Sequence, residues 1–184
     1  MTSATMINGI DVDSLNGMIE AVKADPGLAR ATFHSKTTWR QGFQSVGRIS
    51  DYEQGGGTVE RGRTFESQGD HPEGLLGQNT APAAVETLIA AVAACISGGW
   101  ATFGAAMGIP VERLELELDG DIDLQGFMGL GDQVRPGLER IRGTIYVKST
   151  ASDEQLQQLK ETAEKQSPVV DSLRVPVETR LVRL

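Results

Sequence analysis

Two segments of the chain alternate strictly between apolar and polar positions. In residues 114–124, leucine, isoleucine and one glycine alternate with glutamate or aspartate. In residues 140–148, isoleucine, valine and one glycine alternate with arginine, threonine, tyrosine and lysine. A period of two is typical of a strand with one buried face. Opposite charges on the two polar faces favour pairing of these strands, at about 0.2–1 kcal/mol per cross-strand pair. We expect the Gly-rich link between them to be a mobile flap.

Two other segments repeat their apolar residues every three or four positions, as amphipathic helices do. The first carries Leu15, Met18, Ile19 and Val22. Asp13 or Ser14 is expected to cap this helix and Pro26–Gly27 to end it. We interpret it as an accessory helix that covers a sheet edge or a subunit seam. In the second, Ser152 and Gln155 form a capping box ahead of Leu156, Leu159 and Ala163.

Further strands are expected on both sides of these helices. Residues 32–40 and 43–49 are rich in aromatic and β-branched residues, and the short break between them predicts a hairpin. Residues 58–67 predict a third strand and residues 175–184 a last one. The Gly-, Pro- and Asn-rich residues 69–82 are interpreted as a lid or a crossover.

Residues 83–109 are apolar on every side, and Glu86 is their only charged residue. A run of this length could span a membrane. Its Ala/Gly-rich composition and the absence of basic flanks instead favour a buried helix. A chain of this size cannot easily surround such a long helix by itself. We therefore expect a homodimer in which a second copy packs beside it.

The order of these elements, β-β-β-α-β-β-α-β, predicts an α+β protein in which antiparallel sheets wrap around a long central apolar helix. Residues 1–30 form an N-terminal helical extension in this interpretation, and residues 31–184 a single domain. Its parts are an N-terminal β lobe (31–81), the central helix (82–109) and a C-terminal β-β-α-β lobe (110–184).

Composition narrows the classes of function. The chain has 184 residues and a formal net charge of −8, so it lacks the basic stripe that binds nucleic acid. A single cysteine excludes an internal disulfide, and two distant histidines give no metal-ligand spacing. No basic region followed by an apolar one opens the chain. We expect a cytoplasmic protein with no cofactor, no metal, no nucleic-acid partner and no membrane association.

Cys95, in the middle of the apolar run, has two interpretations. It is either a small buried core residue or a nucleophilic thiolate. The thiolate needs a cation within about 4–6 Å to overcome the cost of burial. The apolar run supplies none, so an arginine must come from elsewhere in the chain or from another chain. The candidates are Arg40, Arg48, Arg61 and Arg63, of which Arg40 lies at the expected hairpin turn.

Glu86, in the first turn of the same helix, also has two interpretations. Its carboxylate either interacts favourably with the helix dipole, which is worth about 0.3–1 kcal/mol, or orients an arginine.

Several motifs in a fixed order resemble the OsmC/Ohr family of osmotically induced and organic-hydroperoxide-resistance proteins. They are Ala-Ala-Cys ending at Cys95, Met107-Gly108-Ile109, the acidic strand from Leu114 to Asp123, Val134-Arg135-Pro136-Gly137, and Ser167-Pro168-Val169. The resemblance runs from about residue 32 to residue 184 and is strongest between residues 86 and 168.

This resemblance implies an intertwined homodimer with active sites at the subunit interface and thiol-dependent reduction of organic hydroperoxides. Cys95 matches the family's peroxidatic cysteine, and Arg40 stands in the place of the arginine that keeps it ionised. The family's orienting glutamate lies ten residues before the cysteine, where this chain has Val85; Glu86 follows it. Peroxidase members have a second, resolving cysteine where this chain has Ser167, so an external thiol must be the reductant.

Two functions therefore stay open from the sequence. The first is a peroxidase of the antioxidant and stress-response type, acting through Cys95 with Arg40 and Glu86. The second is a catalytically inactive protein of the same fold, which binds a small apolar ligand or serves as a structural stress protein.

Overall fold

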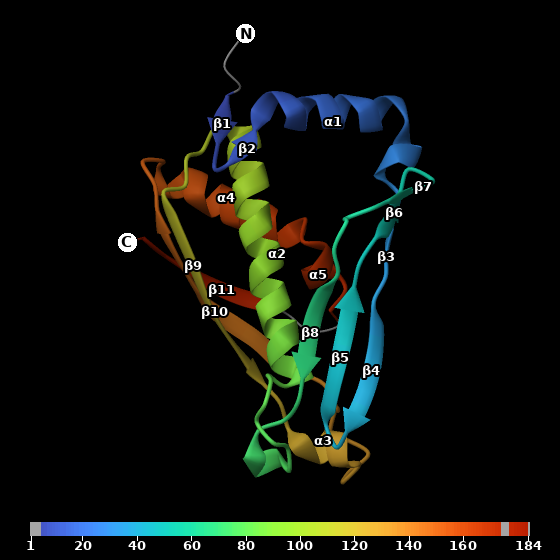
Figure 1. The fold of residues 1–184 in the computed structure, drawn as a ribbon. Coiled ribbons are helices and arrows are strands. Elements are labelled where there is room, and N and C mark those ends of the chain that lie inside the picture. Colours follow the sequence, from blue (N-terminus) through green and yellow to red (C-terminus); the bar gives the residue numbers. More distant parts are fainter. Residues whose placement is uncertain (1–4, 174–176, 184) are drawn as a thin grey trace. The chain divides into compact units, whose positions relative to one another are not determined.

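The computed structural model describes residues 5–173 and 177–183 (Figure 1). The helices are α1 (Val12–Ala24), α2 (Ala84–Met107), α3 (Leu124–Met128), α4 (Asp153–Lys165) and α5 (Pro168–Asp171). The N-terminal strands are β1 (Met6–Ile7), β2 (Ile10–Asp11), β3 (Ala31–Phe33), β4 (Lys36–Gln41), β5 (Gln44–Ile49), β6 (Tyr52–Gln54), β7 (Gly57–Val59) and β8 (Phe65–Gly69). The C-terminal strands are β9 (Arg113–Asp121), β10 (Arg140–Lys148) and β11 (Val177–Arg183).

The chain divides into two compact units, which are described separately. The first combines Met1–Leu15 with Leu88–Leu184, and the second is Asn16–Thr87. The first unit holds most of α2, the sheet β9–β10–β11 and the helices α3, α4 and α5. The second unit holds the sheets β3–β6–β7 and β4–β5–β8. The α+β class is therefore as predicted.

The core of the first unit lies between α2, α4 and the sheet of β9, β10 and β11 (Figure 1). Nine fully buried side chains form most of it: Val92, Ile96 and Trp100 on α2, Ile141, Ile145 and Val147 on β10, and Leu156, Leu159 and Ala163 on α4. The α2 residues recur every four positions and thus share one helix face. By length and composition alone α2 could also cross a membrane, but this face makes it a core helix.

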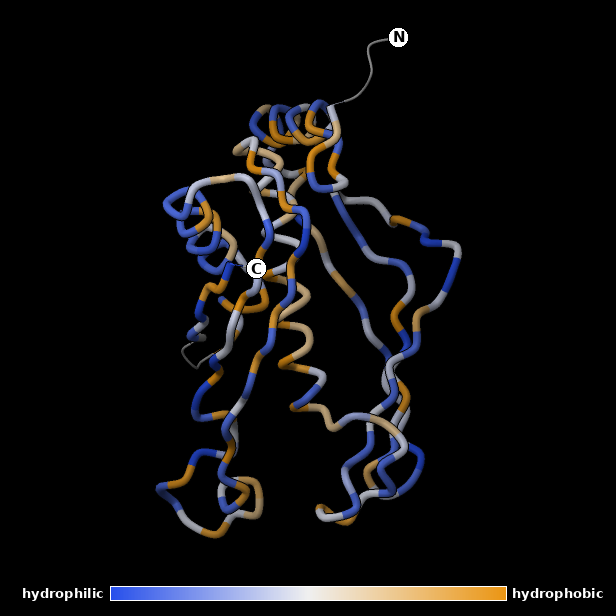
Figure 2. The backbone as a smooth tube through the Cα atoms, turned by 90° about the vertical axis from the view of Figure 1, so that its left-hand side faces the viewer, coloured by the Kyte–Doolittle hydropathy of each residue, from blue (hydrophilic) through white to orange (hydrophobic). Residues whose placement is uncertain are grey.

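The pairing of β9 with β10 confirms the prediction made from the alternating charges in the sequence. The two strands are antiparallel, and Arg140 lies opposite Asp121 and Arg142 opposite Asp119. Arg142 also forms an ion pair with Asp121, which together with its hydrogen bond raises the pKa of the guanidinium. Alternating hydrophobic and hydrophilic residues are visible along these strands (Figure 2).

Four expectations about strands are wrong. Residues 32–40 are not one strand, because β3 pairs with β6 whereas β4 pairs with β5 in another sheet. The last strand, β11, runs parallel to β10 rather than antiparallel. The alternating strand ends at Asp121, because Asp123 accepts a hydrogen bond from the Gln125 N–H and caps α3. Residues 58–67 are not one strand: β7 pairs with β6 and β8 pairs with β5, so the chain changes sheets between them.

The N-terminal strands are tied to the end of α2 through Asn8. Its Nδ2 donates to the Ile109 carbonyl at 3.0 Å, and its Oδ1 accepts from the Val111 N–H at 2.7 Å. One amide side chain thus satisfies two backbone groups about a hundred residues away. The following helix is capped by Asp11, whose Oδ1 accepts from the backbone N–H groups of Asp13 and Ser14. The cap therefore lies just before the two residues that the sequence suggested.

Candidate functional site

Cys95 lies in the middle of α2 and is partly exposed. Its Sγ is 3.0 Å from the Oγ of Ser167, which donates a hydrogen bond to it. Ser167 is only 3% exposed. The two residues that the family resemblance singled out at positions 95 and 167 are therefore in direct contact, although 72 residues separate them in sequence.

The helix contact between α2 and α4 brings Ser167 to this place. Gly99 lies one turn after Cys95, and a Cβ on it would be 3.1 Å from the Cβ of Ala163. The absence of a side chain at Gly99 therefore lets α4 approach α2 closely. The capping box of Ser152 and Gln155 begins α4 as predicted, and the chain leaves that helix just before Ser167.

Ser167 is held on its other side by the start of α5. Its Oγ accepts from the Val170 N–H at 3.2 Å, and its own N–H donates to the Glu164 carbonyl at 3.2 Å. Pro168 occupies the first helical position, where its restricted φ suits a helix start. The serine is thus the N-cap of α5 as well as the hydrogen-bond partner of Cys95.

Two charged side chains in the second half of α4, Lys160 and Glu164, form a pair. Lys160 donates to Glu164 at 3.0 Å, and the other carboxylate oxygen of Glu164 accepts from the Thr179 hydroxyl. Within the described part of this unit, no hydrogen bond or ion pair joins a cationic side chain to Cys95.

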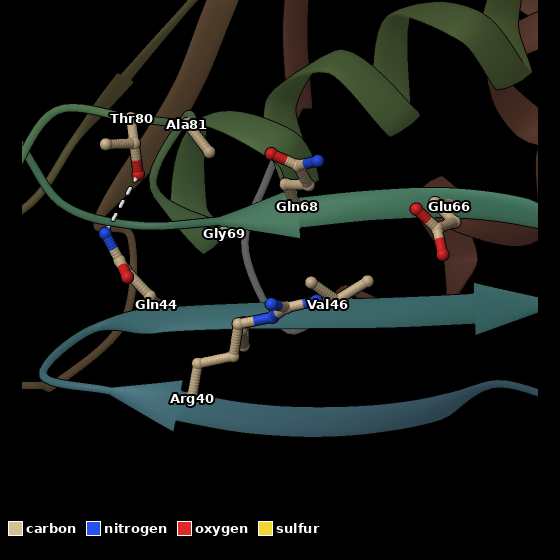
Figure 3. A pocket seen from close by; sticks show the side chains of 9 residues that line it. Arg40, Gln44, Val46, Glu66, Gln68, Gly69, Thr80 and Ala81 are labelled. Atoms are coloured by element: carbon tan, nitrogen blue, oxygen red, sulfur yellow. Dashed lines mark hydrogen bonds between the residues drawn. The ribbon is translucent and has the colours of Figure 1, made fainter.

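Arg40 belongs to the other unit, on β4 next to the β4–β5 turn. It lines a cavity of about 250 Å³ whose other walls include Gln44, Gln68 and Thr80. Figure 3 shows its side chain reaching across β5 beside Val46. Among the described residues, none forms a hydrogen bond or ion pair with the guanidinium of Arg40.

The other three candidate arginines are engaged within the same unit. Arg48 pairs with Glu66 at 2.8 Å. The guanidinium of Arg61 lies 4.9 Å from the ring centre of Tyr52, and that of Arg63 lies 4.5 Å from the ring centre of Phe65. Cation–π contacts of this kind hold the side chains against the sheet surface. Arg40 is the candidate without such a contact in the part of the chain that the structure describes.

Glu86 lies in the first turn of α2, where its Oε2 accepts a hydrogen bond from the Ala83 N–H at 2.7 Å. This bond satisfies one of the backbone donors that a helix start leaves without an intrahelical partner. No ion pair between Glu86 and Arg40 is found among the described residues. The geometry thus agrees with the helix-terminus interpretation and does not bring the carboxylate to the arginine.

Asp70, which sequence reasoning missed, fixes the loop that forms one wall of the Arg40 cavity. It is 2% exposed and accepts hydrogen bonds from the Thr80 hydroxyl at 2.6 Å, the Thr80 N–H at 3.0 Å and the His71 N–H at 2.8 Å. The hydrogen bonds from Thr80 hold the pKa of Asp70 well below its usual range. An aspartate at the start of a Gly/Asn-rich loop was the available signal.

In the described residues no group of three or more His, Cys, Asp or Glu side chains is placed to hold a metal ion. The chemistry available at Cys95 is therefore that of a sulfur atom with a neutral hydroxyl donor.

Comparison with known proteins gives one family and one fold. The family model for OsmC-like protein matches residues 77–181. A search of curated proteins gives no match.

Solved structures of low identity share the fold. An OsmC-like protein from Mycoplasma pneumoniae is 12% identical, with a TM-score of 0.65, and the match covers 83% of this chain and 97% of that one. The organic hydroperoxide resistance protein OsmC from Legionella pneumophila is 14% identical, with a TM-score of 0.53 and coverages of 84% and 98%. Another such protein, OhrB of Bacillus subtilis, is 18% identical, with a TM-score of 0.50 and coverages of 83% and 98%.

Proposed function

Because the chain belongs to the family of OsmC-like proteins, we propose that it reduces organic hydroperoxides, with Cys95 as the reacting thiol and an external thiol as reductant. The observation that carries this proposal is the Cys95 sulfur, partly exposed on a core helix and 3.0 Å from a buried hydroxyl donor. Solved structures that share the fold, from Legionella and Bacillus, are described as organic hydroperoxide resistance proteins, which agrees with this choice of substrate.

The reaction balances in two stages. The Cys95 thiolate attacks the terminal oxygen of the hydroperoxide, an S–O bond forms, the O–O bond breaks, and the alkoxide takes up a proton to leave as an alcohol. The sulfur, now a sulfenic acid, reacts with one external thiol to give a mixed disulfide and water. A second external thiol displaces Cys95 and leaves as the oxidised disulfide. One hydroperoxide is thus reduced for every two thiols oxidised.

Arg40 and Glu86 have different roles in this proposal. Arg40, with no partner among the described residues, would favour the thiolate and polarise the O–O bond from its own chain or from a second copy. Glu86 is a positioning residue, because its bond to the Ala83 N–H fixes the first turn of the helix that carries Cys95.

The external reductant is a small thiol or a thiol protein of the cytoplasm, which is where we place the reaction. The reducing cytoplasmic pool supplies such thiols continuously.

We infer that the active form is a homodimer. Leu88, Ala91, Ala94 and Gly98 recur along one side of α2 and are exposed, although nothing in the helix after Glu86 is charged. An exposed apolar helix face is typical of a subunit contact. Small residues on it allow another helix to approach closely.

The expected molar mass in sedimentation equilibrium is therefore twice that of the chain. Ala91→Glu would place a charge in the contact and shift the mass towards that of one chain, whereas Gln158→Glu on the exposed side of α4 would leave it unchanged. A wild-type protein of monomeric mass at micromolar concentration would contradict the dimer.

The function is tested by stopped-flow measurement of peroxide consumption with an aryl hydroperoxide and dithiothreitol. We expect the wild type to consume the hydroperoxide with formation of one alcohol per peroxide, and Cys95→Ser to fall to the uncatalysed rate. Ser97→Ala, on the same helix, is the control, because its hydroxyl bonds only the Ala93 carbonyl. Equal rates for the wild type and Cys95→Ser would reject the function and leave the inactive, ligand-binding or structural alternative.

A further inference from the structure

We propose that Ser167 is itself a catalytic residue, whose hydroxyl stabilises negative charge on the Cys95 sulfur by hydrogen bonding to it. This inference rests on the proposed function, because it assigns Ser167 a task in the same reaction. The contact is direct, since the Ser167 Oγ lies 3.0 Å from the Cys95 Sγ.

The Ser167 hydroxyl donates its hydrogen to the Cys95 sulfur. A serine hydroxyl has one hydrogen to donate and two lone pairs that accept. Its oxygen already accepts from the Val170 N–H at 3.2 Å, so the hydrogen is directed at the sulfur. A hydrogen-bond donor to a charged group favours the charged form of that group.

The donor is also fixed in place before any substrate binds. Ser167 is 3% exposed, it caps α5, and Pro168 restricts the backbone immediately after it. The close contact between Gly99 and Ala163 holds α4 against the helix that carries Cys95. A donor that need not reorganise when charge develops is more effective than a solvent molecule.

The serine acts without redox chemistry of its own. When the thiolate attacks a hydroperoxide, the S–O bond forms, the O–O bond breaks and the alcohol leaves, all at Cys95. Ser167 keeps its proton throughout and cannot form an S–S bond. It therefore stabilises the sulfur before the attack and leaves the sulfenic acid open to the external thiol named above.

Besides Arg40, which the proposed function assigns to the thiolate, charged side chains lie on the described elements that carry this pair. Glu164 and Lys165 lie at the end of α4 and Asp171 lies on α5, while α2 carries only Glu86, in its first turn. The Glu164 carboxylate accepts hydrogen bonds from Lys160 and Thr179. A substitution at Ser167 leaves every one of these charges in place, so a change in thiol ionisation can be assigned to the lost hydroxyl.

The test is the rate of alkylation of Cys95 by iodoacetamide from pH 5 to pH 10, in wild type, Ser167→Ala and Ser152→Ala. Ser167→Ala should shift the midpoint of the rate profile upward by about one to two pH units and slow alkylation about ten- to hundredfold at pH 6. At the alkaline end of the range, once the rate of each variant has stopped rising with pH, the rates should converge. Ser152→Ala removes the N-cap of α4, which does not touch Cys95, and should follow the wild type.

Superimposable profiles for wild type and Ser167→Ala would overturn the proposal. So would an equal shift in Ser152→Ala, which would assign the effect to helix capping, or a rate difference that persists at the alkaline end of the range, which would assign it to access. Peroxide consumption is measured separately. Its absence from the wild type rejects the proposed function, whereas the alkylation profiles decide on the hydrogen bond.

Discussion

Ser167→Cys should convert the protein into a two-cysteine enzyme whose oxidised Cys95 is captured within the same chain. The serine oxygen lies 3.0 Å from the Cys95 sulfur, so a thiol at this position needs only a small side-chain rotation to reach the disulfide length of about 2.0 Å. The sulfenic acid and the new thiol would condense to a disulfide with loss of water.

One equivalent of hydroperoxide should then leave no free thiol in Ser167→Cys and reduce its intact mass by two hydrogens. The wild type should instead gain one oxygen or form an adduct with the external thiol. Ser172→Cys is the matched control, because Ser172 also lies at α5 but its hydroxyl bonds the Pro168 carbonyl. A Ser167→Cys protein that still accumulates sulfenic acid would show that the two side chains do not meet as described.

Gly143→Ala should lower the free energy of unfolding by about 4 kcal/mol or more, which places it among the most damaging single substitutions. A Cβ on Gly143 would lie 2.0 Å from the Glu117 carbonyl oxygen and 2.9 Å from the Leu118 Cα. These are backbone atoms of β9, so they cannot move aside as a side chain would. The pairing of β9 with β10, which forms the centre of the sheet, would have to open.

Chemical denaturation of Gly143→Ala and Gly137→Ala checks this expectation. A Cβ on Gly137 meets only the end of the flexible Arg135 side chain, at 3.8 Å, so that variant should change stability by less than about 1 kcal/mol. Equal stability of the two variants would contradict the close strand contact at Gly143.

Elements defined by a local pattern were predictable from the sequence. The alternating charges predicted that β9 and β10 pair, because opposite charges on the same face of two neighbouring strands attract each other. The apolar run predicted α2, and the capping box predicted α4. Each of these signals lies within a few residues of the element that it specifies.

Features set by distant partners were not predictable in the same way. The direction of β11 beside β10 depends on the path that the chain takes after α5, and a strand's own residues do not record it. That Arg40 has no ion pair or ring contact among the described residues depends on where Glu66 and the aromatic rings lie. The family motifs drew attention to Cys95 and Ser167, but the residues next to either of them in the sequence do not indicate that the two side chains touch.

The amide of Asn8 has a practical consequence for anyone who shortens this chain. Its side chain forms hydrogen bonds with the backbone on both sides of Pro110, so the segment that contains β1 and β2 holds the polypeptide where it leaves the central helix. A recombinant fragment that starts at α1 would lack Asn8 and leave the Val111 N–H and the Ile109 carbonyl without this partner.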